Sequence, residues 1–482
     1  MRFGGVALIA IMTASCASVN QELLDAQLPD APAAWTADGN VGDAPTGDWV
    51  AAFNDSALRS LISEAVENNN DLLAAAANLD QARAGARITL SNQLPTIGAN
   101  FNAGRNAIVT NPTAAAEAGG SGGTGSSRLY INNFSLGGNL RWEIDLWGRL
   151  TDETRASYRD AKAAYADLAG ARLSIAARVS QAWFALIEAR QQRELAERDT
   201  EARERNLRVT ERRYDRGVSS SLDVRLSRSA LGSSQANLAL RQRLEAEASR
   251  ALEVLLGRYP AAELEAVDSL PTLPALEGAG APGEILARRP DLIAAESRME
   301  AAGLRSRAAR KQFLPQLTFT AQAGTSGPDI GDLLDPRRLA GNFANGLFQP
   351  LFQSGRLIAN SKRARAAAEA SLYNYAQTVL TAYQEAENAL AAETLLELRE
   401  DALRLAYEEA AAAEELTERR YNSGAATIFN LLDAQTRRIS SESQFIQAQQ
   451  QRVSNRVQLY LAIGGDFLTQ ERLAALSAGT GE

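Results

Sequence analysis

RRYDRG at residues 212–217 returns 207 residues later as RRYNSG at residues 419–424. The register between the two stretches continues without a gap as far as Gly257 and Gly464. A repeat of this length indicates two copies of one structural unit. A chain of 482 residues would ordinarily hold several domains. The repeat instead predicts one body with internal pseudo-symmetry.

The upstream halves of the two copies also align. Residues 71–95 match 291–315 at an offset of 220, whereas 148–150 match 355–357 at an offset of 207. The surplus of the first copy falls before residue 148, in a glycine- and serine-rich stretch typical of flexible loops. The expected segments are a signal peptide at 1–15, an extended segment at 16–54, a first repeat at 55–257, an equatorial linker at 258–283, a second repeat at 284–464 and a tail at 465–482.

The composition excludes several classes of function. The chain contains no histidine and a single cysteine, Cys16, so Ser-His-Asp triads and Cys/His metal sites have no residues to build on. Catalysis by carboxylates alone has no motif in its favour, and we expect neither an enzyme nor a cofactor nor a bound metal. A net charge of −8 and arginines interleaved with glutamates argue against a nucleic-acid partner.

The N-terminus reads as a bacterial lipoprotein signal. Arg2 supplies a short positive region, residues 3–13 are an apolar stretch too short to span a bilayer, and small residues precede Cys16. Cys16 would then be the lipidated first residue of the mature protein. Ordinary secretory cleavage with an incidental cysteine is the alternative, and both interpretations predict export. No later apolar stretch is long enough for a transmembrane helix.

A period of two residues marks the strands. Apolar or small residues occupy every even position from 134 to 146, and the odd positions are mostly polar. Similar but weaker patterns predict four strands, two in each repeat, at about 94–109, 130–147, 314–325 and 342–353. A soluble hairpin packed on a core is the alternative for any single strand. Four such strands in an exported chain favour a membrane β-barrel.

Four strands cannot close a barrel, because the smallest membrane barrels have about eight. The chain is therefore expected to oligomerise, and three copies would give about twelve strands around a water-filled interior. The polar positions Asn139, Arg141, Glu143 and Asp145 would face that lumen. The predicted fold class is mainly α with a membrane β-barrel, and each protomer contributes four strands and part of a long α-helical barrel.

The remaining residues predict helices of unusual length. Residues 149–214 contain no proline and one glycine, and 356–421 contain neither, so each can be one helix of about 100 Å. Each ends at a Tyr-x-x-Gly, where the glycine suits a left-handed stop, and the chain returns as a shorter helix over 218–256 or 425–463. The helices expected over 71–92 and 290–312 would fill the length that the return helices leave uncovered. The proline- and glycine-rich linker should form a belt where the shorter helices meet.

These residues resemble the TolC-type outer-membrane efflux proteins, and within them the lipoprotein branch that includes OprM and NodT. The most specific motifs are RPDLIAAE at 289–296, FLPQL at 313–317, LFQSGR at 351–356 and LLDAQ at 431–435, beside the two Arg-Tyr-x-x-Gly hairpins. The resemblance implies a homotrimer with a twelve-stranded barrel in the outer membrane, attached to outer-membrane lipid, and a helical barrel in the periplasm. It also implies docking onto a periplasmic adaptor protein and an inner-membrane pump of the resistance-nodulation-division type.

The resemblance predicts an exit duct that exports small molecules or drugs and contributes to antibiotic resistance. A type I protein secretion channel would have the same architecture with other partners, and a structural periplasmic coiled-coil scaffold is a third alternative. Genes flanking this one would distinguish the first two. Conductance in membranes would exclude the scaffold.

The resemblance further implies a gate at the hairpin ends, with Phe429, Asn430 and Asp433 in the constriction. Asp433 alone carries a charge there, so we expect one ring of carboxylates that favours cations. A plain helix-surface carboxylate near an N-terminus is the alternative. A bond between Asp223 and Tyr421 would latch the gate, although Asp223 also fits a helix-capping box.

The hairpin turns are the expected contact surface for the adaptor. Their plain interpretation is a helix-ending turn and no more. The candidate contact residues are Tyr214, Gly217, Val218, Gly424 and Ala425.

Overall fold

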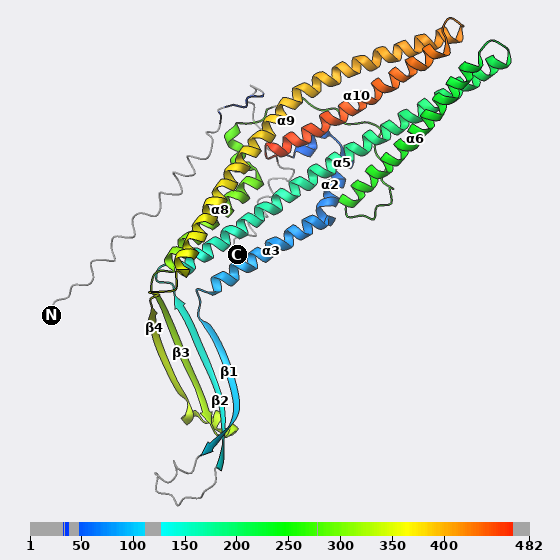
Figure 1. Cartoon of the computed structure of the whole chain (residues 1–482). Coiled ribbons are helices and arrows are strands. Elements are labelled where there is room, and N and C mark those ends of the chain that lie inside the picture. The colour runs from blue at the N-terminus through cyan, green and yellow to red at the C-terminus, as the bar shows by residue number, and fades with distance from the viewer. Residues whose placement is uncertain (1–31, 33, 38–47, 111–126, 277, 466–482) are drawn as a thin grey trace, which may run out of the picture. The chain divides into compact units, whose positions relative to one another are not determined.

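The computed structural model describes residues 32, 34–37, 48–110, 127–276 and 278–465 (Figure 1). The predicted signal peptide, the lipidation at Cys16, the glycine-rich stretch and most of the tail lie outside this part of the chain. About 70% of the described residues are in helices and 13% in strands, which confirms the mainly α class with a four-stranded sheet. Two compact units divide it: residues 1–79, 163–296 and 373–482, and residues 80–162 and 297–372.

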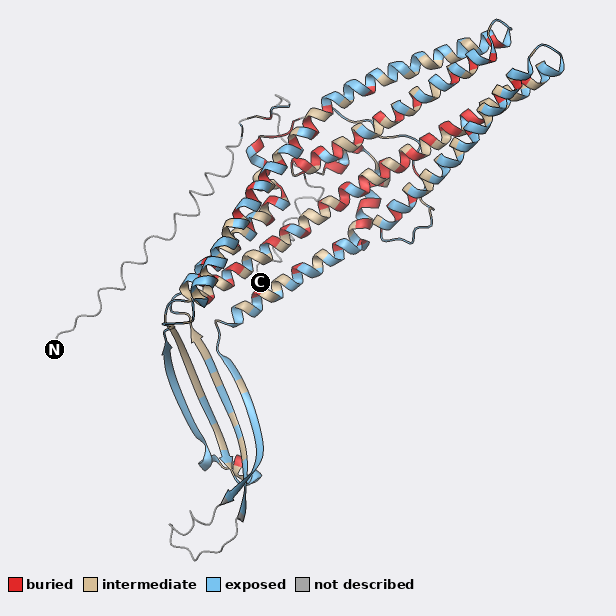
Figure 2. Cartoon of the chain, in the orientation of Figure 1, coloured by how far each residue is buried: buried red, intermediate tan, exposed pale blue. Residues whose placement is uncertain are grey.

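Two helical hairpins lie mostly in the first unit, although both long helices begin in the second. The first hairpin consists of α5 (Arg149–Asp215) and α6 (Ser221–Leu255), and the second of α9 (Arg356–Asn422) and α10 (Ile428–Ala462). The long helices have 67 residues each and the return helices 35 each, as the repeat predicts. Figure 2 shows that buried positions are concentrated along the middle of α5. No helix among the described residues has the length and apolar composition to cross a membrane.

Short helices meet the return helices end to end in this unit. Asn69, which has an extended backbone (ψ 123°), separates α2 (Ser56–Asn68) from α3 (Asn70–Ser91), the helix expected over 71–92. The Asn69 amide donates to the carbonyl of Leu255 at 2.8 Å. In the second copy Arg289, just before α8 (Pro290–Lys311), donates to the carbonyl of Ala462 at 3.1 Å. Both acceptors are 207 residues apart, so the repeat extends to individual hydrogen bonds.

The linker between the copies is anchored by a buried carboxylate. Glu253, 2% exposed, accepts bonds from the backbone N–H groups of Ala262, Glu263 and Leu264 at 2.8, 2.7 and 3.3 Å. Burial raises the pKa of Glu253, but these donors outweigh it and hold the pKa below its ordinary value. The linker ends in the short helices η2 (Pro282–Glu284) and α7 (Ile285–Arg288).

The segment before the first repeat was expected to be extended, but its end is not. Residues Trp49–Phe53 form the short helix η1, started by the Asp48 carboxylate, which accepts from Val50 N–H. Trp49 stacks on Tyr460 of α10 with ring centroids 5.9 Å apart, and Phe53 contacts Phe184 of α5 at 5.2 Å. These buried rings explain the helix, because a compact turn places both aromatic side chains on one side.

The second unit holds an antiparallel sheet in the order β1-β2-β3-β4. Its strands are Thr96–Thr110, Ser127–Ile144, Gln316–Gly327 and Ala340–Phe348. Ile97, Leu140, Ala321 and Phe343 are in register across all four strands. Gly98, Asn139, Gln322 and Asn342 form the next row, and successive rows point to opposite faces. The sheet thus has an apolar face and a polar face. The helices η3 (Ile330–Leu334) and η4 (Pro336–Arg338) lie between β3 and β4.

The end of β2 corrects one predicted site. Asn139, Arg141 and Glu143 lie in the strand, but Asp145 follows its last residue, Ile144. The Asp145 carboxylate accepts from Leu150 N–H at 3.0 Å and Thr151 N–H at 2.7 Å, so it caps the start of α5. Free N–H groups at a helix start need such an acceptor, and Asp145 is therefore no member of the polar strand face. The fourth strand also ends earlier than 353, at Phe348.

Candidate functional site

The two hairpin turns have the same backbone. Gly217 and Gly424 have φ of +74° and +82°, a left-handed conformation that disfavours other residues. Val218 N–H bonds the Arg213 carbonyl and Ala425 N–H bonds the Arg420 carbonyl, both at 2.8 Å. This pattern closes the last turn of a helix and satisfies its free carbonyls. The turns therefore stop the long helices at a fixed residue, and the exposed Tyr214 and Val218 lie at the hairpin end.

Each return helix begins with a capping box. Asp223 accepts from Ser220 N–H at 2.8 Å, and Asp223 N–H donates to the Ser220 hydroxyl at 3.2 Å. Thr427 and Asn430 repeat the arrangement at 3.3 and 3.4 Å. The predicted box is confirmed, and a second one was not foreseen. Asn430, a candidate constriction residue, therefore uses its amide oxygen to start α10.

The expected hydrogen bond between Asp223 and Tyr421 is absent from the described residues. The Asp223 carboxylate is used by its own helix start, and the Tyr421 hydroxyl lies 3.2 Å from the Thr210 hydroxyl of α5. Tyr421 is 4% exposed and packs with Ile428 and Leu431. The predicted bond is therefore not formed: the Asp223 carboxylate accepts from Ser220 N–H, and the Tyr421 hydroxyl lies beside Thr210.

Arg213 makes the contact that sequence reasoning missed. Its guanidinium lies over the Tyr421 ring, 4.4 Å from the centroid, and donates to the carbonyls of Tyr421 and Asn422 at 3.1 and 3.2 Å. A cation that binds the last carbonyls of a helix also complements the negative end of the helix dipole. Thr210 and Arg213 of α5 thus hold the end of α9. We call these three side chains, Thr210, Arg213 and Tyr421, the clasp.

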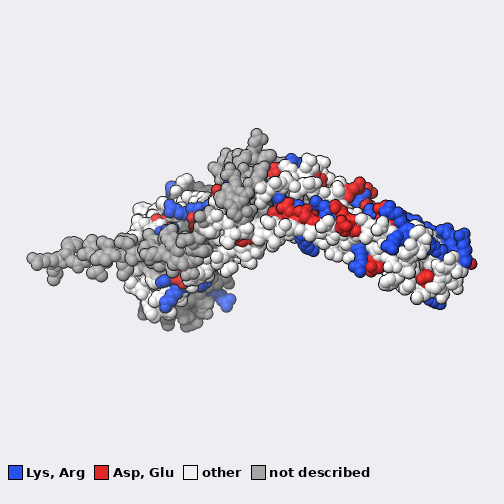
Figure 3. Space-filling model, turned by 90° about the horizontal axis from the view of Figure 1, so that it is seen from above, with Lys and Arg blue, Asp and Glu red and all other residues white. Residues whose placement is uncertain are grey.

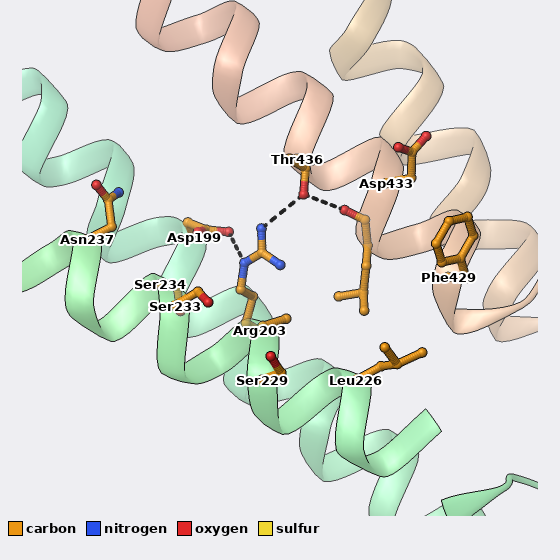
Figure 4. Close-up of a pocket in the computed structure, with 12 residues that line it drawn as sticks. Asp199, Arg203, Leu226, Ser229, Ser233, Ser234, Asn237, Phe429, Asp433 and Thr436 are labelled. Carbon is orange, nitrogen blue, oxygen red and sulfur yellow. Dashed lines mark hydrogen bonds and ion pairs between the residues drawn. The ribbon is translucent and has the colours of Figure 1, made fainter. Parts of the chain in front are cut away.

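A groove with a volume of about 530 Å³ lies beside the clasp, between α6 and α10 over α5 (Figure 4). Phe429 and Asp433 of α10 line one side, and Leu226 of α6 lies on the other. Leu226 and Asp433 are equivalent positions of the repeat, 207 residues apart. The structure therefore brings two predicted constriction residues to one groove, together with the counterpart of Asp433 in the first copy.

Asp433 is not a free charge. Its carboxylate accepts from the Arg437 guanidinium at 2.9 Å, one helical turn along α10, and both side chains are exposed. An exposed pair of this kind contributes little to helix stability. It nevertheless places a positive charge beside each carboxylate. Phe429, 66% exposed, is the large apolar side chain at this position.

A buried ion pair forms the floor of the groove. Asp199 and Arg203 of α5 pair at 2.8 Å, and Arg203 also reaches the Thr436 hydroxyl at 3.5 Å. Burial raises the pKa of Asp199 above its ordinary value, although the Arg203 charge lowers it. Asn206 donates to the Gln435 side chain at 3.0 Å one turn further along. Polar contacts, rather than apolar packing alone, therefore set the position of α10 against α5.

Arginine is concentrated at the end of the first hairpin but not of the second, where the corresponding residues 412–435 contain two arginines and four acidic residues. Residues 205–228 contain seven arginines and three acidic residues, in a protein whose net charge is −8. Figure 3 shows Lys and Arg side chains gathered toward the hairpin ends on the visible face. Such a surface attracts acidic partners. No group of three or more His, Cys, Asp or Glu side chains in the described part of the chain is placed to hold a metal ion.

Comparisons with known proteins agree with this architecture. A family model described as "Outer membrane efflux protein" matches residues 61–258 and 281–465. The toluene efflux pump outer membrane protein TtgC of Pseudomonas putida is 31% identical over 92% of both chains. Outer membrane protein OprJ of Pseudomonas aeruginosa is 30% identical over 96% of both. The open state of the Neisseria gonorrhoeae MtrE outer membrane channel superposes with a TM-score of 0.78 at 28% identity, covering 92% of this chain and 99% of that one.

Proposed function

The chain belongs to the outer membrane efflux protein family, and from this premise we propose that it is the exit duct of a tripartite pump that exports small molecules and drugs. The observation that carries the proposal is the match of the family to both copies of the repeat, strands and hairpin ends included. Relatives are named for efflux of toluene and of antibiotics. The protein acts as a passage and catalyses no reaction.

The duct is a homotrimer. In each chain β1 and β4 are the outer strands of the described sheet, and they run antiparallel to each other. β4 of one copy can therefore pair with β1 of the next in the same antiparallel sense. Three copies give twelve strands, with the apolar face toward lipid and the polar face, which includes Asn139, Arg141 and Glu143, toward the lumen.

The partners bind at the hairpin ends. An adaptor in the periplasm contacts the turns at Tyr214, Gly217, Val218, Gly424 and Ala425, and links the duct to an inner-membrane pump of the resistance-nodulation-division type. The concentration of arginines around the first turn supports an adaptor with an acidic surface at that contact. A lipid on Cys16 adds a second attachment to the outer membrane.

The gate lies at the same end. Phe429, Asn430 and Asp433 form the constriction, and the clasp holds α9 against α5 when it is closed. Opening requires the second hairpin to move away from the first, so the contacts of Arg213 and Tyr421 must break or rearrange. Asp433 gives the constriction cation preference, which its pairing with Arg437 reduces.

A deletion strain tests the function. Cells without the gene should accumulate more of a fluorescent pump substrate and become more susceptible to solvents and antibiotics, and the wild-type gene should restore both. Unchanged accumulation and susceptibility in the deletion strain would contradict the proposal.

A matched pair of variants tests the docking end. Val218→Asp places an acid at the turn, where the side chain is 74% exposed, and should abolish efflux while the protein still reaches the outer membrane. Val254→Asp makes the same change at the other end of α6, where the side chain is 59% exposed, and should leave efflux intact. Full efflux with Val218→Asp would exclude the turn as the docking site.

A further inference from the structure

The clasp between the two hairpins is not symmetric, because each hairpin supplies different residues to it. The first hairpin supplies Thr210 and Arg213, and the second supplies Tyr421. A contact between two similar units is either mutual, with the same patch on both, or head-to-tail, with different patches. In a mutual contact the equivalent tyrosine of the first hairpin, Tyr214, would be covered by the second. Tyr214 is instead 48% exposed, whereas Tyr421 is 4% exposed.

The second hairpin carries a full copy of the donating half. Thr210 and Arg213 correspond to Thr417 and Arg420 at the offset of 207. The Thr417 hydroxyl bonds the carbonyl of Ala413 at 2.7 Å, just as the Thr210 hydroxyl bonds that of Asn206 at 2.9 Å. The local structure of the two threonines is therefore the same. Arg420 is exposed and makes no contact with an aromatic ring in the described structure.

An apolar residue next to the clasp also differs in burial between the two copies. Val209 packs against the cluster of Tyr421, Ile428 and Leu431 from the first hairpin. Its counterpart, Leu416, is a large apolar side chain that is 54% exposed. Among the described residues, Leu416, Thr417 and Arg420 of the second hairpin thus have no tyrosine to pack against. Within the same part of the chain, Tyr214 of the first hairpin has no such residues packed on it. These two sets of residues are the two halves of one contact. In a single chain they lie on different hairpins and do not meet.

We propose that Thr417 and Arg420 of one copy clasp Tyr214 of the next, so that the contact between copies repeats the clasp within each copy. Head-to-tail contacts of this kind close into a ring when every unit supplies both halves. In the proposed trimer, on which this inference rests, six equivalent clasps would encircle the hairpin ends. Three lie within chains and three between them.

The two kinds of clasp differ in charge. Arg213 donates to the carbonyls of Tyr421 and Asn422, and the counterpart of Asn422 is Asp215. Arg420 of one copy would therefore meet a carboxylate beside the carbonyls of Tyr214 and Asp215. A contact with an added pair of exposed charges is weakened by salt more than a neutral one. The clasps between copies are accordingly the more salt-sensitive set.

Two cysteine pairs test the inference in the full-length trimer. Thr417→Cys with Tyr214→Cys should be joined by a short bismaleimide into covalent dimers and trimers on denaturing gels. Thr210→Cys with Tyr421→Cys occupies the equivalent positions within one chain and should give an internally linked monomer under the same conditions. Each single variant controls for reaction through Cys16 and should give no ladder.

A ladder from the first pair alone supports the proposal. If the Thr210/Tyr421 pair reacts while the Thr417/Tyr214 pair gives no link, or links only within a monomer, the proposal is overturned. Heat-modifiable trimer bands and channel conductance of the untreated variants report on the proposed function separately. Intact trimers without the ladder would therefore refute the contact and leave the duct in place.

Discussion

Removing the Arg213 guanidinium should open the channel. Arg213→Ala deletes two charge-assisted bonds to the end of α9 and the stacking on Tyr421. Bonds of this type contribute about 1.5–3 kcal/mol when buried, but Asn422 is exposed and water can replace part of the loss. Stacking of a cation at a partly exposed ring adds about 0.5–1 kcal/mol. We take about 2 kcal/mol per protomer as the net stabilisation of the closed state.

That free energy corresponds to a change of about 30-fold in the opening equilibrium. Single-channel recordings in planar bilayers should therefore show rare openings for the wild type and openings about 30 times more frequent or longer for Arg213→Ala. Arg213→Lys keeps the charge but loses the planar guanidinium that stacks on the Tyr421 ring and donates to both carbonyls through Nη2, so it should lie in between. Wild-type open probability in Arg213→Ala, with trimers intact, would refute the assignment of the clasp to the gate.

Three further predictions concern single side chains. Tyr421→Phe keeps the ring under Arg213 and loses only the contact with Thr210, so it should raise open probability several-fold at most; an effect larger than that of Arg213→Ala would contradict this ranking. Asp433→Ala should raise conductance and weaken cation preference, and Arg437→Ala should strengthen that preference; reversal potentials in a salt gradient that match the wild type in both would exclude Asp433 from the constriction. Because the Glu253 pKa is lowered in the folded protein, its stabilisation is present above the ordinary value of 4.5 and lost as the pH falls below it. Glu253→Gln should therefore lower the melting temperature at pH 7, but its melting temperature should fall less than that of the wild type between pH 6 and pH 4. Parallel plots of melting temperature against pH for the two proteins would contradict the role of Glu253 as an anchor.

The repeat and the lengths of the helices could be predicted because their signals are local and continuous. The absence of proline over 149–214 and 356–421 permits unbroken helices, and Gly217 and Gly424 mark their ends. The strands followed from their period of two residues, since alternation and register both express the pleat. In each case neighbouring residues alone determine the outcome.

The errors arose where one side chain chooses between a local and a distant partner. Asp145 continues the alternation of β2 in the sequence, but the start of α5 needs an acceptor and takes it. The Asp223 carboxylate likewise accepts from Ser220 N–H in its capping box and makes no bond to Tyr421. The N–H groups at a helix start are close in the sequence, so a side chain bonds them without the entropic cost of closing a long loop. A local cap therefore forms in preference to a long-range bond.

Arg213 was missed because its partners are backbone carbonyls of another hairpin, and these leave no mark in the sequence. One signal was available. The duplicated Arg-Tyr pair is conserved between the copies at 213–214 and 420–421, beyond what a turn alone requires.

A reversible lock on the clasp tests most directly whether the duct opens at its hairpin ends. Thr210→Cys with Tyr421→Cys can be joined within each chain by a cleavable cross-linker in cells that carry the pump, and efflux of a fluorescent substrate can be followed before and after cleavage. Efflux should stop when the cysteines are joined and recover when the link is cut. Efflux at the wild-type rate with the link in place would contradict a gate at this end of the protein.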